Sequence, residues 1–473
     1  MSRTPTLLTL LSCVPLAACG GGSKSGPGLI VAGLHSPSDP GLISILRPTA
    51  DGSWSREDLT LEDDAVAMRR GVAKADGRIV WRRVEDGQPV GDPVSFVADP
   101  DGWKLEPVAG LAVEDVEWTT KGANAAKAFQ LKNGNVVHKA MWFEPEHSDP
   151  GILSISANAA MVKLWRKSGD GWKGETLWTG VIGDAEQRIR DVEVGDVDGD
   201  GHDEIVFVSH DRGRVYVLDE RDDGKFDAQM ISETDEPYWI HEVELGNVDG
   251  DAALEIFTTP SEPNQFDGEH QIGRIERFDF QGGSYVRSIV EDDPETHAKE
   301  ILVTDFDGDG KCELFAAMEA KEIRANFTSD YPGHLVLYTF EGEGRPKRET
   351  VGDLVAPMCR FLVCGDTTGD GEPEIIAATK NEGILCFEKD GDTWSRRLVA
   401  GSYRSSGFEH AALLRDVDGD GVLDIVAAGD DQKKIQAFVY DPATPPRWMP
   451  NLILDCRDQD YMAWNLMPMP AGK

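Results

Sequence analysis

Short apolar runs alternate with turns along most of the chain, and no long helical periodicity interrupts them. In the clearest unit, an apolar strand ends at Gly195 and a polar loop leads to further strands over 204–208 and 214–218. A turn at 223–224 then introduces an outer strand that carries Phe226. Short runs bounded by Gly and Asp are typical of β-strands. The pattern therefore predicts an all-β protein built from repeated four-stranded units.

Five acidic loops occupy the same place in successive units. They start at 196, 247, 305, 366 and 416, so neighbouring starts are 50 to 61 residues apart. The first, DVDGDGHDE, has acids at positions 1, 3, 5 and 9 and glycine at position 6. Carboxylates with this spacing in a tight loop converge on a hard cation such as calcium, and they repel one another strongly without one. A repeat of this length between strands predicts a β-propeller with calcium loops.

A second marker, an Asp-Gly-type turn followed by an aromatic residue, indicates the outer strand of each unit. Clear versions begin at Asp51, Asp101, Asp170 and Asp390, and weaker ones lie at Gly282, near Gly342 and before Trp448. With the turn at 223–224, the sequence offers eight outer strands. We therefore expect eight blades. Seven is the alternative if residues 62–150 form one elaborated blade.

The two ends of the chain are predicted to share a blade. Segments 29–33, 41–47 and 54–61 have the pattern of second, third and fourth strands without a first. Residues 458–469 carry Trp464 and Leu466 and suit the missing inner strand. Pairing the C-terminal strand within the N-terminal blade closes the ring and leaves no open sheet edge.

The first residues resemble a bacterial lipoprotein signal peptide over 1–18. Arg3 precedes an apolar run that ends in Leu16-Ala17-Ala18, and Cys19 would be the lipidated residue. An ordinary secretory signal is the other interpretation. A Gly/Ser-rich tether over 19–27 leads to the propeller at 28–473. Gly20 after the cysteine favours the outer membrane, so we expect a cell-envelope lipoprotein that faces the periplasm or the cell surface.

Composition narrows the possible partners. The chain has 473 residues and a formal net charge of −38, which argues against nucleic acid because that partner needs basic patches. The membrane is expected to be contacted only through the lipid anchor, and the protein is expected to be a monomer. Five cysteines follow Cys19 without a zinc-binding pattern, and we expect mostly buried thiols.

The acidic loops resemble the FG-GAP/VCBS repeats of integrin-α-type β-propellers, and the resemblance covers about residues 185–440. In that family an Asp-x-Asp-x-Asp-Gly-x-x-Asp/Glu loop joins the first two strands of a blade and binds calcium. The resemblance implies up to five calcium ions, mainly structural, in loops 196–204, 247–255, 305–313, 366–374 and 416–424. The implied ligands are Asp196, Asp198, Asp200, Glu204, Asn247, Asp249, Asp251, Glu255, Asp305, Asp307, Asp309, Glu313, Asp366, Asp370, Glu374, Asp416, Asp418, Asp420 and Asp424.

Two of the loops depart from the family pattern. In the fourth, Thr368 replaces the middle acid. In the second, Ala252 replaces the usual glycine and Asn247 is neutral. These two loops are expected to bind calcium more weakly than the other three.

A residue that can carry positive charge stands six positions before every loop. These residues are Arg190, His241, Lys299, Arg360 and His410. Their position opens the inner strand, which lines the channel of a propeller. One interpretation is a cationic channel mouth that attracts an anionic ligand. The other is that these residues pair with acids of neighbouring blades, because the acids next to them in sequence are expected on the opposite face of the strand.

Three functions remain open on the sequence. The first is a surface-anchored, calcium-binding propeller that binds a protein or an acidic glycan. The second follows from a resemblance to calcium-containing, eight-bladed polysaccharide lyases that act on uronate polymers. A lyase needs a base and a cation to neutralise the uronate, and the candidates are His241, His297, His410, Arg190 and Arg360. The third is a structural envelope protein.

Overall fold

The structure, a computed structural model, describes most of the chain after residue 27. The described residues are 28–34, 41–59, 65–75, 78–85, 88–99, 102–108, 126–130, 136–157, 160–182, 187–210, 212–234, 238–293, 297–342, 344–407, 410–443, 446–457 and 462–473. The predicted signal peptide, Cys19 and the tether lie outside them. Where the structure describes the chain, no helix is long and apolar enough to cross a membrane.

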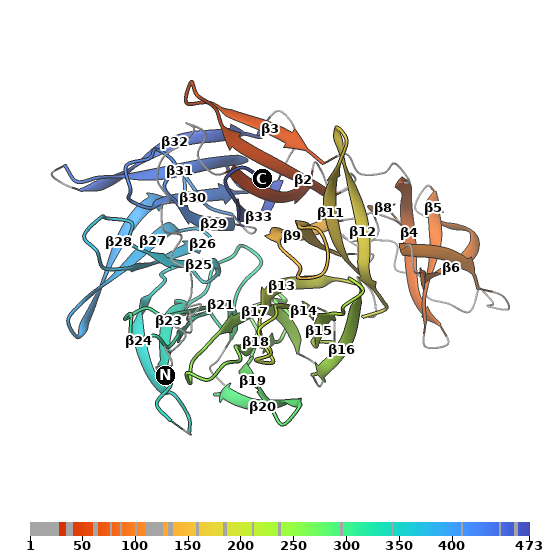
Figure 1. Cartoon of the computed structure of the whole chain (residues 1–473), viewed down its shortest axis with the longest axis horizontal. Coiled ribbons are helices and arrows are strands. Elements are labelled where there is room, and N and C mark those ends of the chain that lie inside the picture. The colour runs from red at the N-terminus through yellow and green to blue at the C-terminus, as the bar shows by residue number, and fades with distance from the viewer. Residues whose placement is uncertain are drawn as a thin grey trace, which may run out of the picture.

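Seven four-stranded antiparallel sheets surround a central axis and form the blades of a propeller (Figure 1). Blade 1 contains β1 (Gly28–Leu34), β2 (Gly41–Pro48), β3 (Trp54–Asp58) and β33 (Met462–Met469). Blade 2 contains β9 (Val136–Phe143), β10 (Gly151–Ala157), β11 (Met161–Ser168) and β12 (Gly171–Thr179).

Blades 3 to 7 each begin with an inner strand, followed by an acidic loop and three further strands. Blade 3 contains β13 (Ile189–Gly195), β14 (Glu204–Ser209), β15 (Arg214–Glu220) and β16 (Phe226–Glu233). Blade 4 contains β17 (Trp239–Gly246), β18 (Glu255–Ser261), β19 (Ile275–Gln281) and β20 (Ser284–Glu291).

The remaining three blades follow the same order. Blade 5 contains β21 (Ala298–Thr304), β22 (Glu313–Met318), β23 (His334–Thr339) and β24 (Lys347–Asp353). Blade 6 contains β25 (Cys359–Gly365), β26 (Glu374–Thr379), β27 (Gly383–Asp390) and β28 (Thr393–Gly401). Blade 7 contains β29 (His410–Arg415), β30 (Asp424–Gly429), β31 (Lys434–Asp441) and β32 (Arg447–Asp455).

The expectation of eight blades is wrong, because the ring has seven. Segments 88–99 and 102–107, on either side of the turn predicted at Asp101, do pair as antiparallel strands, but they belong to a separate five-stranded sheet. That sheet contains β4 (Ala65–Ala75), β5 (Arg78–Glu85), β6 (Gln88–Asp99), β7 (Gly102–Pro107) and β8 (Ala126–Gln130). Figure 1 shows it outside the ring, beside β11 and β12. An Asp-Gly turn specifies a hairpin but not the sheet that the hairpin joins.

The predicted closure of the ring is confirmed. Strand β33 pairs antiparallel with β1, from Gly28 opposite Met469 to Leu34 opposite Met462. Buried Leu466 packs with Leu29 and Val31 in the core between blades 7 and 1. The C-terminal segment therefore supplies the inner strand of the first blade.

The second strand of each blade is the centre of the core. Strands β14, β18, β22, β26 and β30 are buried at every position, because each is covered on both faces by neighbouring blades. A strand buried on both faces reads as a continuous apolar run rather than an alternating one, as in IVFV after Glu204. The cysteines that the structure describes also lie in the interior: Cys312, Cys359, Cys386 and Cys456 are buried, and Cys364 is half-buried.

Candidate functional site

Three carboxylates converge in each of the five acidic loops, with one oxygen from each lying within 4.8 Å of the others. Four groups consist of predicted ligands alone: Asp196, Asp198 and Glu204; Asp305, Asp307 and Glu313; Asp366, Asp370 and Glu374; and Asp416, Asp418 and Asp424. The group in blade 4 is Asp249, Glu255 and Asp279, and Asp279 was not anticipated because it lies on β19. Each group could hold a metal ion.

The acid at position 9 of each loop is buried and faces inward. In all five loops it accepts a hydrogen bond from the backbone N–H at position 2, as in Val197 to Glu204 (2.9 Å) and Val417 to Asp424 (2.8 Å). Burial raises the pKa of Glu204 to about 8 and that of Asp424 to about 7, and the neighbouring loop acids add to the rise. Raised pKa values of this kind indicate a site that lacks positive charge.

The position-1 aspartate organises the turn. In the first loop, Asp196 accepts hydrogen bonds from the N–H groups of Gly199 (2.7 Å) and Gly201 (2.9 Å). In the third loop, Asp305 Oδ1 is buried and, as far as the structure describes its surroundings, has no hydrogen-bond partner. A buried carboxylate oxygen without a donor suits a cation ligand, so the donor set of this loop fits calcium.

The position-5 aspartates, predicted as ligands, also shape the turn. Asp200, Asp251, Asp309 and Asp420 are outside the convergent groups, and each accepts a hydrogen bond from the backbone N–H at position 7. The exception is Asp370, which does join its group. Thr368 there donates to Glu374 (3.1 Å), so the fourth loop compensates for its missing middle acid.

The loops also connect neighbouring blades. The carbonyl of Asp196 accepts a hydrogen bond from Leu254 N in the next loop (2.8 Å). The same contact joins Asn247 to Cys312 (2.7 Å) and Asp366 to Leu423 (3.3 Å). Position 8 of the fourth loop is Pro373, which has no N–H to donate. The loops therefore link adjacent blades as well as adjacent strands.

A β-bulge near the start of the inner strand determines which side chains enter the channel. Six of the seven inner strands have a register shift, and the extra residues are His138, Arg190, His241 with Glu242, Lys299, Arg360 and Trp464. A bulge re-aims a side chain so that two consecutive residues can face the same side. Arg190 and Asp191 both line the central cavity as a result. The expectation that they face opposite sides is wrong for this reason.

The five predicted cations differ in their surroundings. Arg190 and Arg360 line the cavity. His241, Lys299 and His410 are not among its lining residues, and Lys299 is 2% exposed. Lys299 Nζ donates to the carbonyl of Glu262 (2.6 Å), and burial lowers its pKa to about 7. Of the five predicted cations, the structure thus places Arg190 and Arg360 in the lining of the central cavity.

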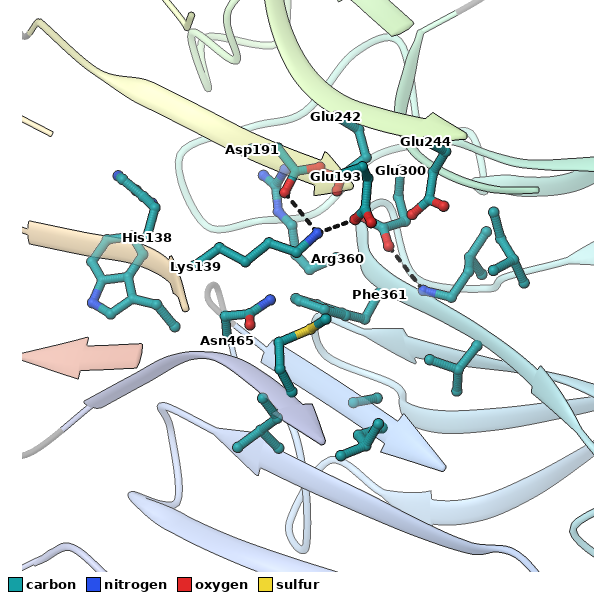
Figure 2. A pocket seen from close by; sticks show the side chains of 18 of the residues that line it. His138, Lys139, Asp191, Glu193, Glu242, Glu244, Glu300, Arg360, Phe361 and Asn465 are labelled. Carbon is teal, nitrogen blue, oxygen red and sulfur yellow. Dashed lines mark hydrogen bonds and ion pairs between the residues drawn. The ribbon is translucent and has the colours of Figure 1, made fainter. Parts of the chain in front are cut away.

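The central cavity has a volume of about 220 Å³ and is lined mainly by inner strands (Figure 2). Five acids line it, namely Asp191, Glu193, Glu242, Glu244 and Glu300. The cationic lining residues are Lys139, Arg190 and Arg360. Carboxylates therefore outnumber cations in this space.

Lys139 lies at the centre of the acidic side of the cavity. Its Nζ is 3.0 Å from Asp191 Oδ1 and also pairs with Glu193, as Figure 2 shows. Burial alone would lower the pKa of Lys139, but the charges of Asp191 and Glu193 outweigh it and raise this pKa well above its usual value. Lys139 was missed in the sequence because blade 2 has no acidic loop to align.

In the remaining cavity acids, the effect of burial on the pKa outweighs that of the nearby cations. Burial raises the pKa of Glu300 to about 8, although Glu300 accepts a hydrogen bond from Leu362 N (3.0 Å). Burial and neighbouring carboxylates raise the pKa values of Glu242 and Glu244 well above the usual range. Glu193 and Glu244 could have been found, since they stand two positions after Asp191 and Glu242 on the same face of their strands.

The three candidate histidines lie outside the set of cavity-lining residues. His410 is 1% exposed and is 2.7 Å from Ser405 Oγ, and burial lowers its pKa to about 4. His297 is buried, with Nε2 3.3 Å from the Glu262 carbonyl. His241 packs edge-on against His210, and burial lowers its pKa well below the usual value. None of these rings is placed to take a proton from a ligand in the cavity.

Comparison with known proteins agrees with this architecture. Residues 196–258, which include the first two acidic loops, match the FG-GAP-like repeat family. No curated protein matches the chain. Among solved structures, an Agrocybe aegerita lectin that recognises non-reducing terminal N-acetylglucosamine has a TM-score of 0.50 at 13% identity, covering 94% of this chain and 95% of its own. A Lactobacillus plantarum protein has a TM-score of 0.51 at 8% identity, covering 94% and 99%. The chain is therefore a seven-bladed β-propeller that contains an FG-GAP-like repeat.

Proposed function

We propose that this protein is an exported, calcium-stabilised β-propeller that binds a ligand in its central cavity without converting it. Acidic loops supply the calcium sites in this proposal, and lipidation of Cys19 anchors the protein to the outer membrane. The observation that carries the binding role is the open cavity, where five carboxylates face three cationic side chains, those of Lys139, Arg190 and Arg360. A purely structural propeller would be expected to fill this space with side chains.

The charge of the lining favours a ligand with a positively charged group. An acidic glycan would bring further carboxylates towards Glu242, Glu244 and Glu300, whose pKa values are already raised by burial and by neighbouring carboxylates. A protein or peptide ligand that presents a lysine or arginine side chain would instead form charge-assisted hydrogen bonds with them. Of the two ligand classes expected from the sequence, we therefore favour a protein with a basic side chain.

The lyase alternative has no specific support in the geometry. It requires a base that faces the substrate, and none of the three candidate histidines is among the described residues that line the cavity. The fold does not decide the matter, because one fold hosts many activities. The lectin of similar fold makes a neutral sugar a useful comparison ligand.

Calorimetry on the full-length, calcium-loaded protein in detergent tests the binding proposal. We expect a lysine-rich peptide to bind, and a galacturonate oligomer and N-acetylglucosamine not to bind. Glu244→Gln should weaken peptide binding at least about tenfold, because a hydrogen bond to a charged group contributes roughly 1.5–3 kcal/mol. Asp392→Asn, at the exposed tip of an outer hairpin, is the matched control and should bind normally. Binding of galacturonate alone, or an unaltered Glu244→Gln variant, would contradict the proposal.

A further inference from the structure

We propose that the second acidic loop, 247–255, does not take calcium and that the guanidinium of Arg277 supplies the positive charge in its place. This inference concerns only blade 4. It does not depend on what the central cavity binds.

Arg277 lies among the three carboxylates that converge in this blade. Its Nη2 is 2.8 Å from Asp249 Oδ2 and 3.5 Å from Glu255 Oε1, and it also pairs with Asp279. These are the same three residues whose oxygens lie within 4.8 Å of one another. The Arg277 side chain is only 15% exposed. The guanidinium therefore occupies the place that an ion would need.

The corresponding position in the other four blades is apolar. Arg277 pairs with Phe257, two residues after position 9 of its loop. The residues with the same pairing in blades 3, 5, 6 and 7 are Val217, Leu337, Cys386 and Ala437. All four are buried. None of them can supply charge to its loop, so those four loops still need an external cation.

The second loop has also lost features that shape the others. In loops 1, 3, 4 and 5, the glycine at position 6 has a φ between 92° and 94° and donates its N–H to the position-1 aspartate. Ala252 is not among the described residues with positive φ, and a side chain makes that conformation costly. Asn247 donates its Nδ2 to the Asp251 carbonyl (2.7 Å), so position 1 presents one oxygen instead of two.

A second cation reinforces the replacement. Lys311, from the third loop, donates its Nζ to the Asp249 carbonyl (2.7 Å). Arg277 and Lys311 together bring two positive charges to the second loop, the charge of one calcium ion. A guanidinium forms directional hydrogen bonds with several carboxylates and remains charged at all working pH values. The second loop is thus stabilised by side chains of blades 4 and 5.

The test is the number of calcium ions bound per chain, measured by equilibrium dialysis of the full-length protein. We expect four for the wild type. The variant Asn247→Asp/Ala252→Gly/Arg277→Leu restores the features of the other loops and should bind five. Arg277→Lys keeps the positive charge and should still bind four, with a melting temperature that reports normal folding.

A reciprocal variant completes the experiment. Leu337→Arg places a guanidinium at the equivalent position of blade 5, beside the third loop, and should reduce the count from four to three. Five ions in the wild type would overturn the proposal, as would a triple variant that folds and still binds four. The melting curve of each variant shows whether a lost ion reflects displacement or unfolding.

Discussion

Excess chelator will lower the melting temperature of this protein by roughly 10 °C at neutral pH. The reason is that calcium in the acidic loops binds the native state alone, and each ion present at a hundred times its Kd contributes about 2.7 kcal/mol. Four loops together contribute about 10 kcal/mol, which a chain of this length converts to roughly one degree per kcal/mol. Scanning calorimetry with and without chelator measures the shift.

The chelated protein should also become less stable as the pH rises. Folded Glu204 has a pKa of about 8 and folded Asp424 one of about 7, both above their unfolded values of 4.5 and 3.8. Between those limits the native state binds more protons than the unfolded state, so raising the pH from about 5 to 8 destabilises it. Calcium replaces the protons, and the calcium-loaded protein should lose most of this dependence.

Two variants distinguish the loss of calcium from the acidic loops from a general effect of the chelator on the protein. Glu204→Gln removes an acid from one group and should abolish about a quarter of the chelator-induced shift. Asp223→Asn, in an exposed outer turn, is the control and should leave the shift unchanged. A melting curve that does not move in strong chelator would count decisively against calcium in these loops.

Replacing Lys139 by methionine should destabilise the protein by about 3–5 kcal/mol at pH 7. The change leaves buried Asp191 and half-buried Glu193 without the amine that now lies 3.0 Å from Asp191. Removal of one partner from a buried ion pair costs more than the pair contributes, because the remaining charge is not solvated. Urea unfolding monitored by tryptophan fluorescence measures the loss.

The pH dependence of this loss has a definite sign. Although burial favours the neutral form, Lys139 lowers the pKa of Asp191 below 3.8, and its own pKa is raised above 10.5. The pair therefore contributes stability at pH values between these two, and its contribution falls as Asp191 is protonated in acid. The deficit of Lys139→Met should be fully present from about pH 4 to about pH 10 and should narrow only below pH 4. Lys347→Met, on exposed β24, is the control, and an equal loss in both variants would refute the role of Lys139.

The acidic loops show how far local pattern determines a site. Spacing predicted every member of four of the five carboxylate groups, because positions 1, 3, 5 and 9 lie in one turn and one adjacent strand end. It could not predict Asp279 or Arg277, which approach the second loop from β19. Their contribution depends on the pairing of β18 with β19, and no local spacing contains that register.

The central cavity, in contrast, depends mainly on the tertiary structure. The row of cations before the loops was visible in the sequence, but their orientation was not, because a bulge re-aims Arg190 and Arg360 and other blades supply the partners. Because blade 2 has no such loop, an alignment of the acidic loops could not identify Lys139. Its importance arises only when blade 2 is placed beside blade 3, where it meets Asp191 and Glu193.

The sequence by itself determined the all-β class, the acidic loops and the closure of the ring by 458–469, because periodicity, turn residues and loop spacing act over a few neighbouring residues. Only the tertiary structure decided the number of blades, the separate sheet of β4 to β8 and the acidic cavity. These depend on which hairpin joins which sheet and on charges that meet across blades. The acidic loops remain local features of the chain, whereas the cavity belongs to the ring.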